Sequence, residues 1–171
     1  AHEAAVLEVG SNHPGEMEPL LRLIQPKYGV LTSIGREHLE FFGDLAGVIE
    51  EEGALAEALP PDGCLFVSDG YVNHKVHKFS PDGVLIKSWG EPGSGPGQFD
   101  LVHSVWVDSD YRVYICDREN NRIQLFDREG DFLEEWPGYL RPDKLWFDAD
   151  ETIFMAEVGH RVTILDRQNR V

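Results

Sequence analysis

The sequence predicts an α+β chain in which a short βαβα segment is followed by antiparallel strands. Within the first 63 residues, strand-like apolar runs alternate with helical patterns. From Cys64 onward, the apolar runs are short and rich in β-branched and aromatic residues. Asp-Gly and Glu-Gly turns separate these later runs. We therefore expect two domains, residues 1–63 and residues 64–171.

The N-terminal domain reads as strand, helix, strand, helix. We expect strands over residues 4–9 and 28–34 and helices over residues 15–25 and 45–59. Asp44 is the expected N-cap of the second helix. This order is typical of a parallel βαβ unit.

The C-terminal domain contains one strand–turn–strand unit three times, at intervals of about 40 to 50 residues, a spacing typical of propeller blades. The paired strands are predicted at residues 65–69 and 75–79, 113–117 and 122–126, and 153–157 and 161–165. Residues 104–108 and 144–148 are the expected inner strands of the second and third copies. The first copy has no evident inner strand, and the third stops before its outer strand. We therefore predict two antiparallel β-propeller blades and a partial third.

Composition and charge limit the partners and the cellular location that we expect. The net charge of −16 excludes nucleic acid and anionic membrane as expected partners, because both require a basic face. No apolar run approaches the roughly 20 residues of a membrane-spanning helix. No basic-then-apolar leader is visible, so we expect no signal peptide and a cytoplasmic location as expressed.

Acidic clusters leave one metal prediction open. The sequences DSD at residues 108–110 and DAD at residues 148–150 recur at one place in the repeat. Carboxylate oxygens suit calcium, whereas the same residues also form Asx turns. We favour turns and keep calcium as the alternative. Residues 50–52, three consecutive glutamates, are expected to form a solvated helix face.

Tryptophans and cysteines fall at repeating strand positions. We expect the four tryptophans to pack between blades rather than to stack on a ligand. The two cysteines, Cys64 and Cys116, are not in metal-ligand spacing and are expected to be free, buried thiols. The tryptophans are Trp89, Trp106, Trp136 and Trp146.

The repeats resemble the NHL-repeat β-propellers and, among them, the peptidyl-α-hydroxyglycine α-amidating lyases. The matching motifs are VSDGYVN at residues 67–73, WGE at 89–91, PGQF at 96–99, HS at 103–104 and DRENNRIQ at 117–124. The resemblance implies that Tyr71 is a catalytic tyrosine and Arg118 an active-site arginine. It also implies that His103 is one of three zinc-binding histidines.

These residue types suit that chemistry. Zinc polarises a hydroxyl, a tyrosinate takes a proton, and an arginine holds a carboxylate. A zinc site needs about three protein ligands, however, and only His103 matches. We therefore expect an interaction module without intrinsic catalysis, which binds a peptide or protein ligand. The alternative is a zinc lyase whose site an oligomer completes.

Residues 1–63 resemble the Mur ligases, in particular the branch that adds D-alanyl-D-alanine to the UDP-muramoyl tripeptide. The motifs are LEVGSNHPGE at residues 7–16 and TSIGREHLEFFG at residues 32–43. The resemblance implies Glu8 and His38 as magnesium ligands, and it places Glu52 where the family has a carbamylated lysine. The family's Gly-rich phosphate loop is absent, so we expect neither ATP nor magnesium to bind. A ligase remnant is the weakest alternative.

The two resemblances meet at the turn PPDG, residues 60–63. We interpret the chain as a chimera, natural or engineered, that is joined at this shared turn. An incomplete set of blades leaves strand edges and apolar faces open. We therefore expect either that the N-terminal segment covers one open face or that the chain forms homo-oligomers through its open blade edges.

Overall fold

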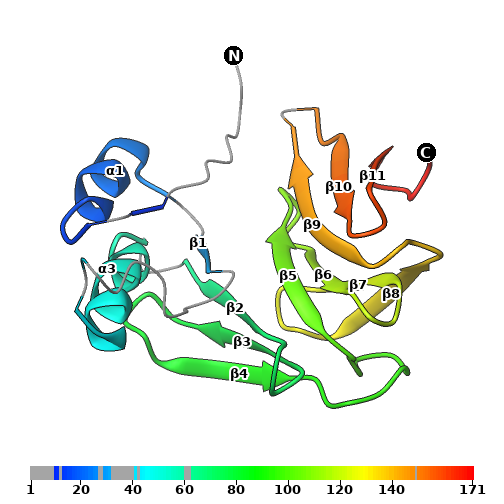
Figure 1. Ribbon diagram of the computed structural model, residues 1–171, viewed down its shortest axis with the longest axis horizontal. Helices are drawn as coiled ribbons and strands as arrows, with labels where there is room; N and C mark the ends of the chain where they lie inside the picture. The colour runs from blue at the N-terminus through cyan, green and yellow to red at the C-terminus, as the bar shows by residue number, and fades with distance from the viewer. Residues whose placement is uncertain are drawn as a thin grey trace. The chain divides into compact units, whose positions relative to one another are not determined.

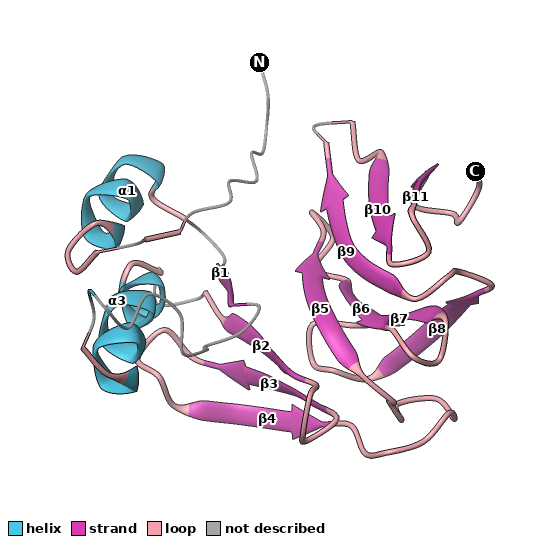
Figure 2. Ribbon diagram, in the orientation of Figure 1, coloured by secondary structure: helices cyan, strands magenta, loops and turns pink. Residues whose placement is uncertain are grey.

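The computed structural model describes residues 10–11, 13–26, 29–31, 41, 43–59, 63–148 and 150–171. Among these described residues, the helices lie in the N-terminal part, and three sheets of mainly antiparallel strands follow (Figures 1 and 2). This confirms the α+β prediction. The expected strand at residues 4–9 and the turn at residues 60–62 lie outside the described residues.

The described residues of the N-terminal part include two helices, α1 (Met17–Ile24) and α3 (Leu45–Glu57). Asp44 Oδ1 accepts a hydrogen bond from the Gly47 amide at 3.0 Å, which confirms the predicted N-cap of α3. The two helices pack together through apolar side chains that also contact the first sheet. This cluster comprises Met17, Leu21, Leu55, Leu59 and Leu65, with Val67 and Phe79 packed against it.

Glu51 corrects the expectation of a fully solvated acidic helix face. Its carboxylate is buried and accepts hydrogen bonds from the backbone amides of Gly15 and Met17, both at 2.7 Å. Amides at a helix N-terminus lack intrahelical partners, and an anion there is favoured by the helix dipole. Glu51 therefore supplies from α3 the cap that no side chain of α1 provides.

The first sheet has the order β1 (Gly29–Leu31), β2 (Leu65–Asp69), β3 (Lys75–Phe79), β4 (Leu85–Trp89). β1 pairs in parallel with β2, with Gly29 opposite Leu65. β1 therefore occupies the place beside β2 where the repeat lacks an inner strand of its own. A Cβ at Gly29 would lie 3.0 Å from Leu55 Cγ, so glycine allows α3 to approach this strand closely.

The second and third sheets follow the repeat. The second is β5 (Val102–Val107), β6 (Val113–Asp117), β7 (Arg122–Phe126) and β8 (Phe132–Pro137). The third is β9 (Pro142–Phe147), β10 (Ile153–Glu157) and β11 (Arg161–Leu165). All their neighbouring strands are antiparallel. The six paired repeat strands have their predicted bounds, and within the described residues the third sheet has no outer strand.

The second and third sheets pack face to face, and Figure 1 shows β9 beside β5. Trp106 stacks on Phe147 with ring centroids 5.3 Å apart, and Trp136 is buried in the same core. Trp89 packs against Phe126. Inter-blade packing is thus confirmed for three tryptophans. It is wrong for Trp146, which is 47% exposed because no sheet covers its face among the described residues.

The recurrent Asp turns are Asx turns, as favoured from the sequence. Asp108 Oδ1 accepts hydrogen bonds from the amides of Asp110 and Arg112. Asp148 Oδ1 does the same for Asp150 and Thr152. The second carboxylate oxygen of Asp108 is also bonded to protein donors, including Arg167 of the third repeat at 3.0 Å.

Both cysteines are buried free thiols, as predicted. Burial raises the pKa of Cys116 to about 12, which makes this thiol inert at neutral pH. Within the described residues, no helix is long and apolar enough to cross a membrane.

Candidate functional site

The site lies where strands of successive repeats end. Tyr71 stands in the turn after β2, His103 lies near the start of β5, and Arg118 follows β6. Gly70 allows the first of these turns to approach β5, because a Cβ at this position would lie 1.9 Å from the Val102 carbonyl oxygen. Any larger residue would push the Tyr71 turn away from β5.

The structure brings together the three side chains that the lyase resemblance implies. The rings of Tyr71 and His103 meet edge to face with centroids 5.9 Å apart. Arg118 Cζ lies 5.8 Å from the centre of the Tyr71 ring, within cation–π range. Tyr71 is 69% exposed, so the cluster offers an aromatic face to solvent beside an imidazole and a guanidinium.

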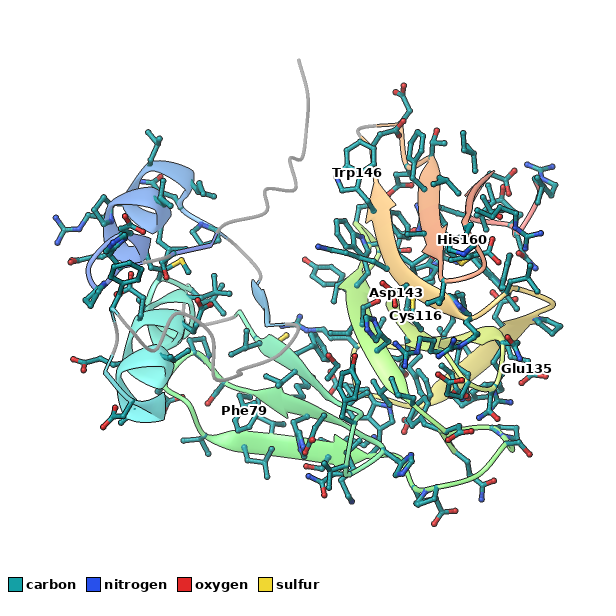
Figure 3. All side chains as sticks on the ribbon, viewed as in Figure 1. Phe79, Cys116, Glu135, Asp143, Trp146 and His160 are labelled. Carbon is teal, nitrogen blue, oxygen red and sulfur yellow. The ribbon has the colours of Figure 1, made fainter. Side chains whose placement is uncertain are left out.

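Asp143, at the start of β9, fixes the imidazole (Figure 3 labels Asp143). His103 Nδ1 lies 2.8 Å from the Asp143 carbonyl oxygen. A carbonyl oxygen can only accept, so Nδ1 carries a proton, and in the neutral imidazole Nε2 then holds the lone pair. In that form Nε2 is the nitrogen that accepts a ligand N–H or binds a metal.

Asp143 also joins His103 to Arg118. Its Oδ1 lies 3.3 Å from His103 Nδ1 and 3.7 Å from Arg118 Nη1. The sequence carried no signal for this residue, because its role depends on β9 lying beside β5. It is the member of the cluster that the residue-by-residue comparison with the lyases missed.

Arg118 is held by an ionic network. Its Nε donates to Glu119 at 2.9 Å, and Arg141 donates to the same carboxylate oxygen at 2.7 Å. Burial acts to lower the pKa of Arg118, but Glu119 and Tyr71 outweigh burial and raise it above its ordinary value. The hydrogen bond from Arg141, helped by Arg118, lowers the pKa of Glu119. Both groups are therefore charged at neutral pH.

The cluster does not form a zinc site by itself. It supplies one imidazole, and among the described residues no group of three His, Cys, Asp or Glu side chains is arranged to hold a metal. His77 is engaged elsewhere, with Ser88 at 2.7 Å and Asp69 at 3.3 Å. Since a catalytic zinc needs about three protein ligands, the donors present here do not fit that ion.

The ligase-like residues are placed only in part. Glu8 and His38, the implied magnesium ligands, lie outside the described residues. Glu52 lies on α3, half-buried. Its carboxylate cannot span the distance that a carbamylated lysine covers, since its side chain is shorter.

The helical segment and the repeated sheets define a hybrid protein, in which an α/β part is followed by β-propeller repeats. The chain belongs to the Mur ligase middle domain family, whose model matches residues 1–91. A second family model, described as a 6-bladed beta-propeller, matches residues 57–137. The two matches overlap over residues 57–91, which include β2, the strand that pairs with β1 of the N-terminal segment. The match is therefore chimera-like.

Curated relatives fall into the same two groups, NHL-repeat or amidating proteins and Mur ligases. Human NHL repeat-containing protein 3 is 35% identical over 111 residues, covering 56% of this chain and 32% of the relative. Peptidyl-glycine alpha-amidating monooxygenase B of Xenopus laevis is 43% identical over 82 residues, covering 44% of this chain and 9% of the relative. UDP-N-acetylmuramoyl-tripeptide--D-alanyl-D-alanine ligase of Haemophilus influenzae is 36% identical over 67 residues, covering 39% and 15%. The chain thus spans a third or less of each of these relatives.

Proposed function

We propose that the chain is an NHL-type interaction module, without catalysis of its own, that binds peptides at the Tyr71–His103–Arg118 cluster. The convergence of an exposed aromatic ring, an imidazole acceptor and a guanidinium at one end of the blades carries this proposal. The same cluster offers one imidazole to a metal, which argues for binding rather than zinc chemistry.

Each member of the cluster has a role in holding a peptide. The Tyr71 ring provides apolar area with little conformational entropy to lose. The Nε2 lone pair of His103 accepts a peptide N–H. Arg118 adds positive charge, which favours a ligand with a carboxylate terminus. Because Asp143 and Glu119 hold His103 and Arg118 in place, little ordering is needed on binding.

A peptide titration tests this function. A fluorescein-labelled tripeptide ending in glycine is titrated with the chain, and its anisotropy gives Kd. We expect Tyr71→Ala to weaken binding about tenfold, because the exposed ring is lost. Leu133→Ala removes an exposed apolar side chain outside the cluster and should leave Kd unchanged. Equal affinity for Tyr71→Ala and wild type, or no binding by wild type, contradicts the proposal.

The same convergence favours a second candidate, a lyase that cleaves peptidyl-α-hydroxyglycine when further blades or another copy add the missing imidazoles. In that reaction the bond between the amide nitrogen and the α-carbon breaks, the hydroxyl proton is removed, and a proton reaches the nitrogen. The products are the peptide amide and glyoxylate. In this candidate Tyr71 takes the hydroxyl proton and Arg118 holds the carboxylate, roles that the lyase resemblance implies.

Glyoxylate release separates the two candidates. The chain is incubated with a peptidyl-α-hydroxyglycine with and without added zinc, and glyoxylate is measured. The interaction module predicts no release above the buffer rate in either condition. Zinc-dependent release that disappears in Tyr71→Phe supports the lyase and contradicts the module.

A further inference from the structure

Three polar side chains of the first sheet form a hydrogen-bonded chain across neighbouring strands. Asp69 ends β2, His77 lies within β3 and Ser88 lies within β4, and these strands are adjacent in the sheet (Figure 2). His77 Nδ1 lies 2.7 Å from Ser88 Oγ, and His77 Nε2 lies 3.3 Å from Asp69 Oδ2. The imidazole therefore joins a hydroxyl on one side to a carboxylate on the other.

The carboxylate of Asp69 sets the direction of the hydrogen bonds in this chain. A carboxylate can only accept, so His77 Nε2 carries a proton and donates to Asp69. In the neutral imidazole, Nδ1 then holds the lone pair and accepts from the Ser88 hydroxyl. Asn73 Nδ2 donates to the same carboxylate oxygen at 2.7 Å, which helps to hold Asp69 in place. A hydroxyl, a base and an acid that orients the base are the parts of an activated nucleophile.

The second and third copies of the repeat form the same bridge without a base. At the position of His77, the second copy has Gln124, whose amide donates to Asp117 at 3.1 Å. The third copy has Thr163, whose hydroxyl donates to Glu157. An amide or a hydroxyl can hold the acid in this way, but neither takes up a proton at neutral pH. The imidazole of the first copy thus adds a base to a bridge that the repeat forms without one.

The exposure of the three side chains suits reaction at the hydroxyl. Ser88 is exposed, whereas the side chains of His77 and Asp69 are 20% and 36% exposed. A reagent can therefore reach Ser88 Oγ while the base behind it is mostly covered. The three side chains supply a nucleophile and a base, but none of them is placed to donate to the oxyanion that forms during acyl transfer. Reaction at Ser88 therefore requires an ester with a good leaving group.

We propose that Ser88 is an acylation site for activated carboxylic esters, such as p-nitrophenyl acetate. Ser88 Oγ bonds to the carbonyl carbon, its proton passes to His77 Nδ1, and the bond between that carbon and the nitrophenyl oxygen breaks. p-Nitrophenolate leaves, and the imidazole then releases its extra proton to solvent. The product is a serine ester with a much poorer leaving group, so the acyl group accumulates without turnover. This site is independent of the proposed peptide binding, since it uses none of the residues of that cluster.

Acetylation by p-nitrophenyl acetate tests the site. We expect a burst of p-nitrophenolate equal to the chain concentration, and digestion followed by mass spectrometry should place the acetyl group on Ser88. Hydroxylamine cleaves a serine ester but not an acetylated lysine, so it distinguishes the two products. Ser88→Ala should abolish the burst. Ser94→Ala removes another exposed serine and should leave the burst unchanged.

His77→Gln separates the base from the bridge. Glutamine keeps a donor for Asp69, as Gln124 does for Asp117, but it cannot take the Ser88 proton. We therefore expect acetylation to slow at least about 100-fold. Nitrogen NMR of the neutral wild-type imidazole should show the proton on Nε2, and Asp69→Ala should lose this preference and slow acetylation.

Three results would overturn the proposal. They are a neutral His77 with its proton on Nδ1, no hydroxylamine-sensitive acetyl group on Ser88, and equal acetylation rates for His77→Gln and wild type.

Discussion

Buried acids with arginine partners organise the turns of the repeat at the scale of single residues. Asp117 is fully buried and accepts from Arg122 Nε at 2.8 Å. Arg122 also donates to the carbonyls of Ser94 and Gly95, which ties the inter-blade loop to β7. Glu157 takes the same place in the third repeat. Burial disfavours a charged carboxylate, so its hydrogen bonds and ion pairs must offset the cost of removing it from water.

Glu157 makes the stability of the third sheet depend on pH. Burial acts to raise its pKa, but hydrogen bonds from Arg161, Thr163 and the Leu140 amide lower it below its ordinary value. The unfolded pKa is about 4.3, so the stabilisation is complete above that pH. It is lost as pH falls through the lower folded pKa, where the native carboxylate takes up its proton.

Glu157→Gln should therefore lower the free energy of unfolding by roughly 1 to 2 kcal/mol at pH 7, because charged hydrogen bonds become neutral ones. The difference from wild type should begin to shrink as pH falls below about 4.3 and should disappear only below the lower folded pKa, where the native carboxylate is protonated. Urea unfolding at several pH values measures this difference in the free energy of unfolding. A difference that stays constant from pH 7 to strongly acidic conditions would show that the charge of Glu157 has no part in it.

The candidate site shows what single residues can and cannot reveal in a sequence. Tyr71, His103 and Arg118 were predictable because each stands in a motif with specific neighbours. Asp143 was not, because its contact with His103 joins strands 40 residues apart. Glu51 was misread for the same reason: its partners, Gly15 and Met17, lie at the start of another helix.

At the scale of elements, strand bounds followed from local signals. Short β-branched runs between Asp-Gly and similar turns fix β6, β7, β10 and β11 without reference to the rest of the chain. Local signals did not predict the partner of β2, because β1 pairs with it in parallel and lies far from it in the sequence. Periodicity shows that a strand exists but not which edge it joins.

Two glycine-to-alanine substitutions test the close approach of α3 to β1, and they should change the free energy of unfolding in opposite directions. Gly29→Ala places a Cβ 3.0 Å from Leu55 Cγ and 3.3 Å from Leu65 Cδ1, so these neighbours must shift. We expect a loss of roughly 1 to 2 kcal/mol. Gly53→Ala, in α3 with open space around it, should instead gain about 0.5 to 1 kcal/mol.

Urea unfolding of both variants, followed by far-UV circular dichroism, compares them under one set of conditions. Both changes add one methyl group, and Gly53→Ala shows the effect of that group where it meets no neighbour. Gly29→Ala as stable as Gly53→Ala would contradict the close packing of α3 on the first sheet.

At the scale of the whole molecule, the Mur-like segment and the repeat contribute strands to one sheet. β2 pairs with β1 of the Mur-like segment and lies beside β3 of the repeat. The N-terminal helices cover apolar residues of the first sheet, as one of the two sequence-based expectations proposed. In the proposed function these blades bind a peptide, and among the described residues their lyase-like cluster supplies one imidazole.

Zinc content tests that account most directly. The chain is purified in zinc-containing buffer, passed through gel filtration, and analysed for metal by mass spectrometry, beside His103→Ala. An interaction module predicts far less than one zinc per chain for both proteins, since a single imidazole binds zinc weakly. One zinc per chain in wild type, lost in His103→Ala, would contradict the account and identify a metal centre at His103.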